Sequence, residues 1–131
     1  MTALQFNDDY FYTGDKILIR AVLPQAELVS VQMTLDTGAS VSTLHHSLLA
    51  ALGLADVTSG RHGTLLVANG ESAPCWLHQV EIELLGKRIR IDAAFCPSWD
   101  LRNLLGMSGF MNQLVFAVDH ANHSLHISWQ D

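Results

Sequence analysis

The sequence is poor in positive charge. Only 7 of its 131 residues are Lys or Arg, against 13 Asp or Glu, and the formal net charge is -6. A protein that binds duplex nucleic acid neutralises phosphates with clustered Lys and Arg, and an anionic membrane surface attracts the same residues. This charge balance therefore argues against both nucleic acid and a membrane surface as partners.

Long apolar runs and cysteines are also scarce. The first residues, "MTALQFNDDYFYTGDK", have neither the basic start nor the unbroken apolar stretch of a signal peptide or a membrane anchor. We therefore expect a cytoplasmic protein with no membrane partner. Cys75 and Cys96 are too few for a disulfide framework and form no CxxC pair. Two reduced, partly buried thiols are the plain interpretation, and a single bridge is the alternative.

The residues that are present describe one folded globular domain. Hydrophobic residues make up 49% and charged residues 15% of a chain without repeats or breaks in composition. The runs "KILIRAVLP" and "LVSVQMTLD" are rich in β-forming residues and flank a short loop around Gln25, Ala26 and Glu27. They predict a hairpin whose second strand places Asp36 at its end.

The middle of the chain mixes helix and hairpin signals. In "STLHHSLLAALG" the leucines at 44, 48, 49 and 52 fall on one helical face, which predicts a short helix ending at Gly53. In "TLLVANGESAP" the Asn69-Gly70 pair predicts a two-residue hairpin turn, and Pro74 then favours an edge or projecting position.

Strands dominate the rest. If Leu85 and Gly86 form the turn of "VEIELLGKRIRIDA", Glu83 faces Arg88 and Ile82 faces Ile89, so that charged and apolar residues each face partners of their own kind. A loop at "CPSWDLR", a buried run with a second short helix in "NLLGMSGFMNQL", and a final hairpin of "LVFAVD" and "LHISW" follow. The chain is expected to be mainly β.

The order of these motifs resembles that of the retroviral-type aspartic proteases, or retropepsins. The shared features are "LDTGAS" after an apolar strand, an Asn-Gly hairpin about thirty residues later, and "NLLG" further on. The resemblance implies the retropepsin-like acid protease fold: a closed, barrel-like β lobe with a flap hairpin and one or two short helices. It assigns this domain to residues 15–131 and leaves 1–14 as an extension that forms an edge strand, a dimer contact or a tail.

The resemblance also implies roles for single residues. Asp36 would hold the catalytic water, Thr37 would brace the two active-site loops against each other, and Gly38 would let the backbone approach the carboxylate. These three are the expected catalytic residues. Other expected site residues border the substrate from the loop (Ala39 and Ser40), belong to the flap (Val67, Ala68, Asn69, Gly70 and Glu71), or support the loop from below (Leu104, Leu105 and Gly106).

Hydrolysis of a peptide bond by water needs a base and an acid together, and two close carboxylates supply both by sharing one proton. The chain contains a single D-[ST]-G signature, and Asp56 in "ADVTSG" does not repeat it. The second carboxylate must then come from another copy, which predicts a homodimer. The resemblance further implies a polypeptide substrate, and this chemistry needs no cofactor and no metal.

Simpler interpretations compete with this one. Asp-Thr-Gly can be an ordinary turn. The histidines His120, His123 and His126 straddle a predicted hairpin and favour solvated or packed roles over metal binding, and His45 and His46, adjacent on a helix, are expected to diverge. "GASVS" does not fit the G-x-S-x-G serine nucleophile pattern. The main alternative is a catalytically silent retropepsin-like module for dimerisation or peptide binding.

Overall fold

The computed structural model describes residues 5–66 and 69–130, which form ten β-strands and five short 3₁₀ helices. The strands are β1 Asp8–Phe11, β2 Leu18–Leu23, β3 Val29–Leu35, β4 Ser42–Thr43, β5 Arg61–Leu66, β6 Ser72–Leu84, β7 Lys87–Phe95, β8 Leu104–Leu105, β9 Leu114–Asp119 and β10 Ser124–Trp129. The 3₁₀ helices span Pro24–Ala26, His46–Leu48, Val57–Ser59, Met111–Gln113 and His120–Asn122. None of these helices is long and apolar enough to cross a membrane.

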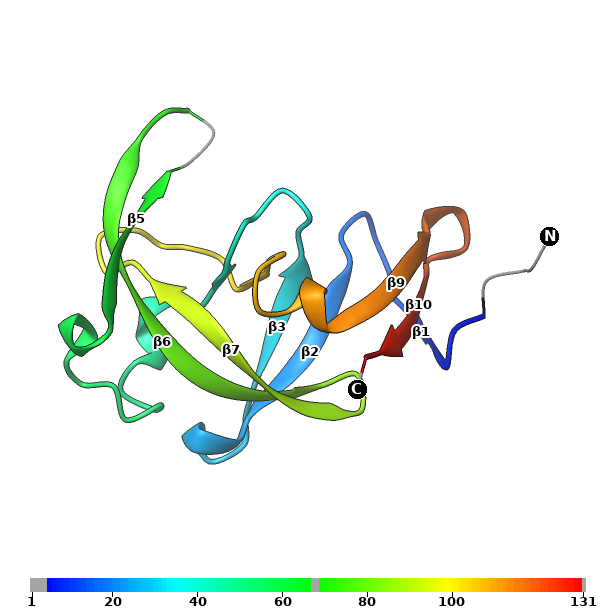
Figure 1. Cartoon of the computed structure of the whole chain (residues 1–131), viewed down its shortest axis with the longest axis horizontal. Helices are drawn as coiled ribbons and strands as arrows, with labels where there is room; N and C mark the ends of the chain where they lie inside the picture. The colour runs from blue at the N-terminus through cyan, green and yellow to red at the C-terminus, as the bar shows by residue number, and fades with distance from the viewer. Residues whose placement is uncertain (1–4, 67–68, 131) are drawn as a thin grey trace.

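Six strands close into a barrel. Their order is β2-β3-β8-β4-β7-β6, and a pairing of β2 with β6 through Val22 and Glu83 closes the ring. Strand β5 lies outside the ring and pairs with the outer part of β6, so the β5–β6 hairpin projects from the barrel (Figure 1). The expected mainly β class and the closed barrel with a projecting hairpin are confirmed.

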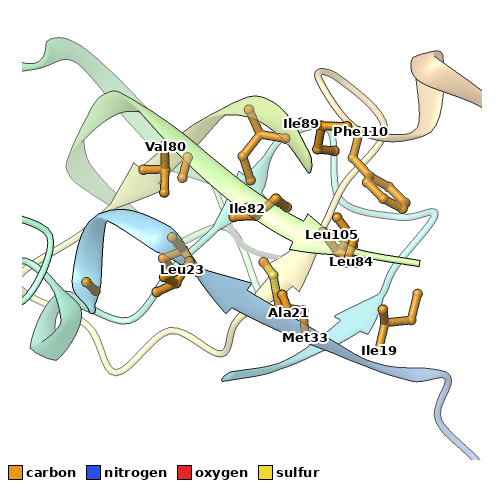
Figure 2. Close-up of a cluster of buried hydrophobic side chains, with 14 of the residues drawn as sticks. Ile19, Ala21, Leu23, Met33, Val80, Ile82, Leu84, Ile89, Leu105 and Phe110 are labelled. Carbon is orange, nitrogen blue, oxygen red and sulfur yellow. The ribbon is translucent and has the colours of Figure 1, made fainter. Parts of the chain in front are cut away.

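The barrel interior is filled by alternate residues of its strands. Ile19, Ala21 and Leu23 of β2 point inward, where they meet inward residues of β6 and β7 (Figure 2). This alternation follows from the two-residue period of a strand. Full burial of a Leu or Ile side chain contributes about 1.5–3 kcal/mol, so this cluster is the main source of stability for the lobe.

The hairpin of β2 and β3 has the predicted form. The strands pair antiparallel, with Ala21 opposite Val31, and turn through the 3₁₀ helix Pro24–Ala26. Because β3 ends at Leu35, Asp36 is the first residue beyond the strand. The hairpin thus delivers the acid to the barrel rim.

The hairpin of β6 and β7 also has the predicted register. Glu83 lies opposite Arg88 and Ile82 opposite Ile89. The turn residues Leu85 and Gly86 both have positive φ, 50° and 77°, as a two-residue turn between twisted strands requires. The Arg88–Glu83 ion pair, 2.6 Å between Nη2 and Oε1, is solvent-exposed, so it marks the register more than it stabilises the fold.

The helix expected over "STLHHSLLAALG" is much shorter than predicted. Ser42–Thr43 forms strand β4 beside β7, and the Leu44 N–H donates to the Ala94 carbonyl at 3.2 Å. Helical structure is confined to the 3₁₀ helix His46–Leu48. Leu44 therefore reaches the core from an extended segment, and the leucine spacing that resembles a helical face serves a strand end followed by turns.

The turn at Asn69-Gly70 does not have the predicted register. Leu66 pairs with Ser72, whereas a two-residue turn at Asn69-Gly70 would pair Leu66 with Ala73. Between β5 and β6 the Asn69 side-chain oxygen accepts from the Glu71 N–H at 2.9 Å, and Gly70 has a φ of +88°. Asn69 thus forms its own local turn, a frequent role for asparagine that competes with the tight hairpin.

Two further predictions are confirmed. Pro74 lies in the projecting part of β6, which pairs with β5 but not with β7. Strands β9 and β10 form the expected final hairpin, and β1 pairs with β10 to complete a three-stranded sheet in the order β1-β10-β9. Among the described residues β1 is therefore an edge strand of this second sheet.

Candidate active site

Asp36 lies at the end of β3, in a loop that is held from two sides. Its backbone N–H donates to the Leu105 carbonyl of β8 at 3.0 Å, which continues the parallel pairing of β3 with β8. One side-chain oxygen, Oδ1, accepts from the Gly38 N–H at 2.8 Å. The half-buried carboxylate is thus held in one orientation.

Gly38 lies close to this carboxylate. A Cβ atom on Gly38 would lie 3.2 Å from Asp36 Oδ1, closer than side chains normally approach. The absence of a side chain at Gly38 therefore leaves room for the carboxylate beside the backbone. Thr37 is exposed between them.

A second set of bonds ties the far half of the loop to the residues after β8. The N–H of Met107 donates to the Ala39 carbonyl and that of Ser108 to the Ser40 carbonyl, each at 2.9 Å. Gly106 donates its N–H to the buried Ser42 hydroxyl at 3.0 Å. The loop of residues 36–41 therefore runs along residues 105–108, and two segments far apart in the sequence form one unit.

The three residues expected to support the loop differ in their surroundings. Leu105 is fully buried in the core, Gly106 is buried against Val41, and Leu104 is half-buried and faces the hollows around Asp36. Leu105 thus belongs to the core, and Leu104 belongs to the site surface.

A pocket of about 250 Å³ separates the Asp36 loop from the projecting hairpin. It brings together five residues that the sequence singles out, Asp36, Gly38, Ala39, Ser40 and Leu104, with residues that the sequence does not single out. Those residues are Val41, Thr43, Leu65, Leu66 and Leu101. Leu65 and Leu66 come from β5, so one wall of the pocket belongs to the hairpin. The apolar run "TLLV" is the sequence signal that could have identified Leu65 and Leu66 as site residues.

The expected hairpin residues are divided. Asn69, Gly70 and Glu71 are exposed near the end of the hairpin and do not line this pocket. Val67 and Ala68 lie outside the described residues. Among the described residues of the hairpin, Leu65 and Leu66 are the ones that line the pocket beside Asp36.

A larger hollow of about 690 Å³ lies against Asp36 from another direction. Asp15, Lys16 and Ile17 contribute to it from the segment before β2. Val118 contributes from β9, and His120 contributes from the 3₁₀ helix that follows β9. Its rim carries charges of both signs. Asp36 thus lies between an apolar pocket and a wider charged depression.

Asp36 has no bonded carboxylate partner among residues 5–66 and 69–130. Its side chain accepts only from Gly38 there. A single carboxylate can be an acid or a base at a given moment, but not both. The described part of one chain therefore offers a single carboxylate at this position.

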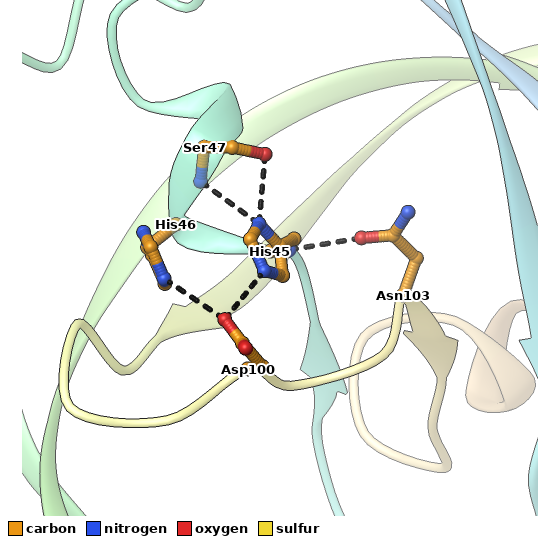
Figure 3. A network of polar contacts seen from close by, with 5 residues as sticks. All are labelled: His45, His46, Ser47, Asp100 and Asn103. Atoms are coloured by element: carbon orange, nitrogen blue, oxygen red, sulfur yellow. Dashed lines mark hydrogen bonds and ion pairs between the residues drawn. The ribbon is translucent and has the colours of Figure 1, made fainter.

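The loop of residues 96–102 forms the remaining wall, and a polar network anchors it (Figure 3). His45 Nε2 lies 3.1 Å and His46 Nε2 lies 3.4 Å from the same oxygen of Asp100. The backbone N–H of His45 donates to Asn103 Oδ1 at 2.9 Å. The hydrogen bonds from His45 and His46 lower the pKa of the Asp100 carboxyl.

The expected divergence of His45 and His46 is wrong. Their rings stack with centroids 4.4 Å apart, because the two residues lie at the start of a 3₁₀ turn and not within a regular helix. In this geometry both side chains reach Asp100, which lies 54 residues further along the chain than His46.

Within residues 5–66 and 69–130, His45, His46 and Asp100 have ligand atoms close enough to one another to hold a metal ion. His45 Nδ1 accepts from the Ser47 backbone N–H at 3.1 Å, which places the ring proton on Nε2, the atom that faces Asp100. A metal would need the Nε2 lone pair and a proton on Nδ1, the reverse arrangement. The geometry fits a hydrogen-bonded clamp on the 96–102 loop better than a metal site.

The histidines of the final hairpin have packing partners instead of a shared ligand. His120 Nδ1 lies 2.7 Å from the Tyr12 hydroxyl, and His126 Nδ1 lies 2.6 Å from Asp9 Oδ1. Both partners come from the N-terminal segment. These contacts fasten that segment to the second sheet.

Comparisons with known proteins give a family and a fold. The model of the family described as "gag-polyprotein putative aspartyl protease" matches residues 26–112, the segment that holds Asp36, the β5–β6 hairpin and β8. The structure is similar to that of a retropepsin-like aspartic protease from Rickettsia conorii, with a TM-score of 0.67 and 23% identity over 92% of this chain and 98% of that chain. Among curated proteins, none matches the sequence.

Proposed function

Because the chain belongs to the retropepsin-like gag-polyprotein aspartyl protease family, we propose that it is an aspartic endopeptidase that acts as a homodimer. In this proposal Asp36 of each subunit contributes one of the two catalytic carboxylates. The domain that carries the activity comprises residues 15–131, and residues 1–14 are an extension from which β1 joins the second sheet.

The observation that carries the proposal is the placement of Asp36. The carboxylate is held by Gly38 and by the pairing of β3 with β8, it borders two hollows, and it has no acid bonded to it within the described chain. A twofold axis near Asp36 would bring it next to its own copy. Thr37 is exposed beside it, where its hydroxyl is available to the partner loop.

The chemistry follows from two carboxylates at short range. Like charges so close do not both ionise, so the pair shares one proton and titrates as a unit. The ionised member takes a proton from the attacking water, and the protonated member gives one to the carbonyl oxygen and later to the leaving amine. Gly38, Ala39 and Ser40 shape the loop beside the reacting bond, while Leu104, Leu105 and Gly106 support it.

The substrate in this proposal is an extended polypeptide. Strand β5 pairs only with β6 among the described residues, so its other edge presents backbone groups to which a peptide strand can add. Leu65 and Leu66 place this edge beside the Asp36 pocket. Closure of the hairpin, with Val67, Ala68, Asn69, Gly70 and Glu71 toward its end, would cover the substrate and exclude water.

The test is cleavage of an unfolded polypeptide by the wild type and by Asp36→Asn. We expect the wild type to cleave and the variant to fall to background with an unchanged melting temperature, because asparagine keeps the shape but does not exchange the proton. Mass spectrometry of the products measures the result. A wild type that binds peptide without cleaving it, and binds as tightly as Asp36→Asn, would indicate the silent binding module instead.

A further inference from the structure

Two cysteines lie where the projecting hairpin leaves the barrel. The pairing of β6 with β7 ends at Trp76 opposite Phe95. One further step in the same register places Cys75 opposite Cys96. Both are buried, with 4% and 1% of their surface exposed, and both are free thiols.

The kind of pair follows from the turn at the other end of this hairpin. Leu84 and Lys87 close the two-residue turn, so they form a hydrogen-bonded pair, and such pairs alternate with non-hydrogen-bonded pairs along an antiparallel ladder. Trp76 and Phe95 are then hydrogen-bonded, and Cys75 and Cys96 are not. In a non-hydrogen-bonded pair the Cα atoms are about 4.5 Å apart and the side chains are closest, within the range that a disulfide spans.

The two sulfur atoms face the same side of the sheet. Cys75 and Cys96 belong to one small buried cluster with Ala73 and Ala94. The backbone bond that would follow this pair needs an N–H at residue 97, which is a proline and has none. Beyond Trp76 and Phe95, therefore, no ladder bond joins the two strands. We call this point, where β6 leaves β7, the hinge of the hairpin, and the cysteine pair is the first contact beyond it.

We propose that Cys75 and Cys96 are a modification site: they form a reversible intramolecular disulfide by exchange with a small-molecule disulfide, and the bridge clamps the base of the β5–β6 hairpin. A thiolate of one cysteine attacks the small disulfide, which forms a mixed disulfide and releases one small thiol. The second cysteine then attacks the protein sulfur and releases the other small thiol. The two cysteines are oxidised and the small disulfide is reduced to two thiols.

The surroundings of the pair set the speed of this exchange. Burial raises the pKa of the Cys75 thiol, and the neighbouring Cys96 raises it further. The reactive thiolate is therefore scarce at neutral pH, and a small disulfide reaches the sulfur only when the hairpin base opens. The rate of oxidation therefore depends on how often the base of the hairpin opens.

The consequence for activity rests on the proposed protease function. Residues 72–75 of β6 pair with β5 and not with β7, so the hairpin moves about the point where β6 leaves β7. A bridge there moves this point outward by one residue pair. It also ties the hairpin to Cys96, which begins the loop that carries Leu101 into the Asp36 pocket. The oxidised enzyme should admit substrate more slowly than the reduced one.

The native protein itself provides the first test. It is incubated with oxidised glutathione without denaturant, free thiols are blocked, and peptides are mapped by mass spectrometry without reduction. We expect the intact mass to fall by two hydrogens and one peptide pair to be linked through Cys75 and Cys96, with full reversal by reduced thiol. Mixed disulfides that persist, bridges between chains, or unreacted thiols after hinge opening has been verified by hydrogen exchange would each overturn the proposal.

Matched variants separate the bridge from its effect. Cys75→Ala and Cys96→Ala keep an apolar side chain in the cluster and should each give glutathione adducts or no reaction, but no loss of two hydrogens. Peptide cleavage by the wild type should fall several-fold on oxidation and recover on reduction, while both variants stay insensitive. Equal cleavage by oxidised and reduced wild type would overturn the clamping role. A bridge that forms in a protein without any protease activity would contradict the proposed function and leave the modification site intact.

Discussion

Gly106 lies so close to the Asp36 loop that a methyl group in its place would overlap the backbone of Val41. An added Cβ would lie 2.4 Å from both the carbonyl carbon and the carbonyl oxygen of Val41. Backbone atoms do not rotate aside as a side chain does. The "LLG" motif therefore ends in glycine because two backbone segments meet there.

We predict that Gly106→Ala lowers the free energy of unfolding by about 1 to 3 kcal/mol or more, the range for overpacked sites. Urea denaturation measures it. Gly63→Ala is the matched control, because its Cβ would meet its nearest atom, Cys75 Sγ, at 3.4 Å. Equal losses for the two variants would show that the overlap with Val41 does not matter.

Leu104 and Leu105 are neighbours with different surroundings, so their truncation should have different effects. Leu105→Ala should cost about 2 to 5 kcal/mol of stability, as is usual for a buried leucine. Leu104→Ala should cost less stability and lower peptide cleavage more, because Leu104 faces the pocket beside Asp36. Thermal melts and cleavage rates of both variants test this difference, and the same pattern of loss in both variants would contradict it.

For single residues, the "LDTGAS" motif identifies Asp36 as the acid, and the structure shows which residues surround it. Asp36, Gly38 and Gly106 could be singled out because each has a chemical or steric need for its residue type. Leu101 could not, because a leucine in an irregular loop has no periodicity to indicate which way it faces. Its place beside Asp36 depends on contacts made far away in the sequence.

Those contacts belong to the loop of residues 96–102, which His45 and His46 hold through Asp100. The pKa of the Asp100 carboxyl is lower in the folded protein than in the unfolded chain, because it accepts hydrogen bonds from the histidines. Its contribution to stability is therefore present above the unfolded pKa and lost as the pH falls through the folded pKa. At acidic pH the loop loses this anchor.

We predict that the Asp100 carboxyl titrates at a lower pH in the wild type than in His45→Ala or His46→Ala. Carbon-detected NMR of the side-chain carboxyl measures the midpoints. Asp119 is the internal control. Its pKa is lowered chiefly by hydrogen bonds from Asn122, so its midpoint should be the same in the wild type and in both variants. An unchanged Asp100 midpoint in both variants would show that the histidines do not hold it.

The elements could be predicted where local rules and burial agree. The β6–β7 hairpin was predictable to the residue, because charge pairing and apolar pairing require the same register. Asn69-Gly70 carries an equally strong local signal, but the Asn69 side chain bonds to the Glu71 N–H, and Leu66 pairs with Ser72 instead of Ala73. The spacing of the leucines after Ser42 predicts a helix, because it does not reveal that β4 pairs with β7.

The whole molecule is expected to be active only as a pair. If one chain supplies one Asp36, specific activity should fall on dilution as dimers dissociate. Excess Asp36→Asn protein should inhibit the wild type by forming mixed dimers with one acid. Cleavage rates across a dilution series, with subunit exchange verified by mass spectrometry, measure this. Constant activity per wild-type chain in both experiments would show that each chain works alone.

The backbone hydrogen bonds between residues 36–41 and residues 105–108 affect when the site can form during synthesis of the chain. The Asp36 N–H has its partner at Leu105, and the carbonyls of Ala39 and Ser40 have theirs at Met107 and Ser108. A ribosome makes the Asp36 segment long before these partners emerge, and pairings so distant in sequence also form slowly. A nascent chain that has not yet reached Ser108 therefore carries Asp36 without these backbone partners, and we expect the proposed cleavage to begin only after this part of the chain has been made and folded.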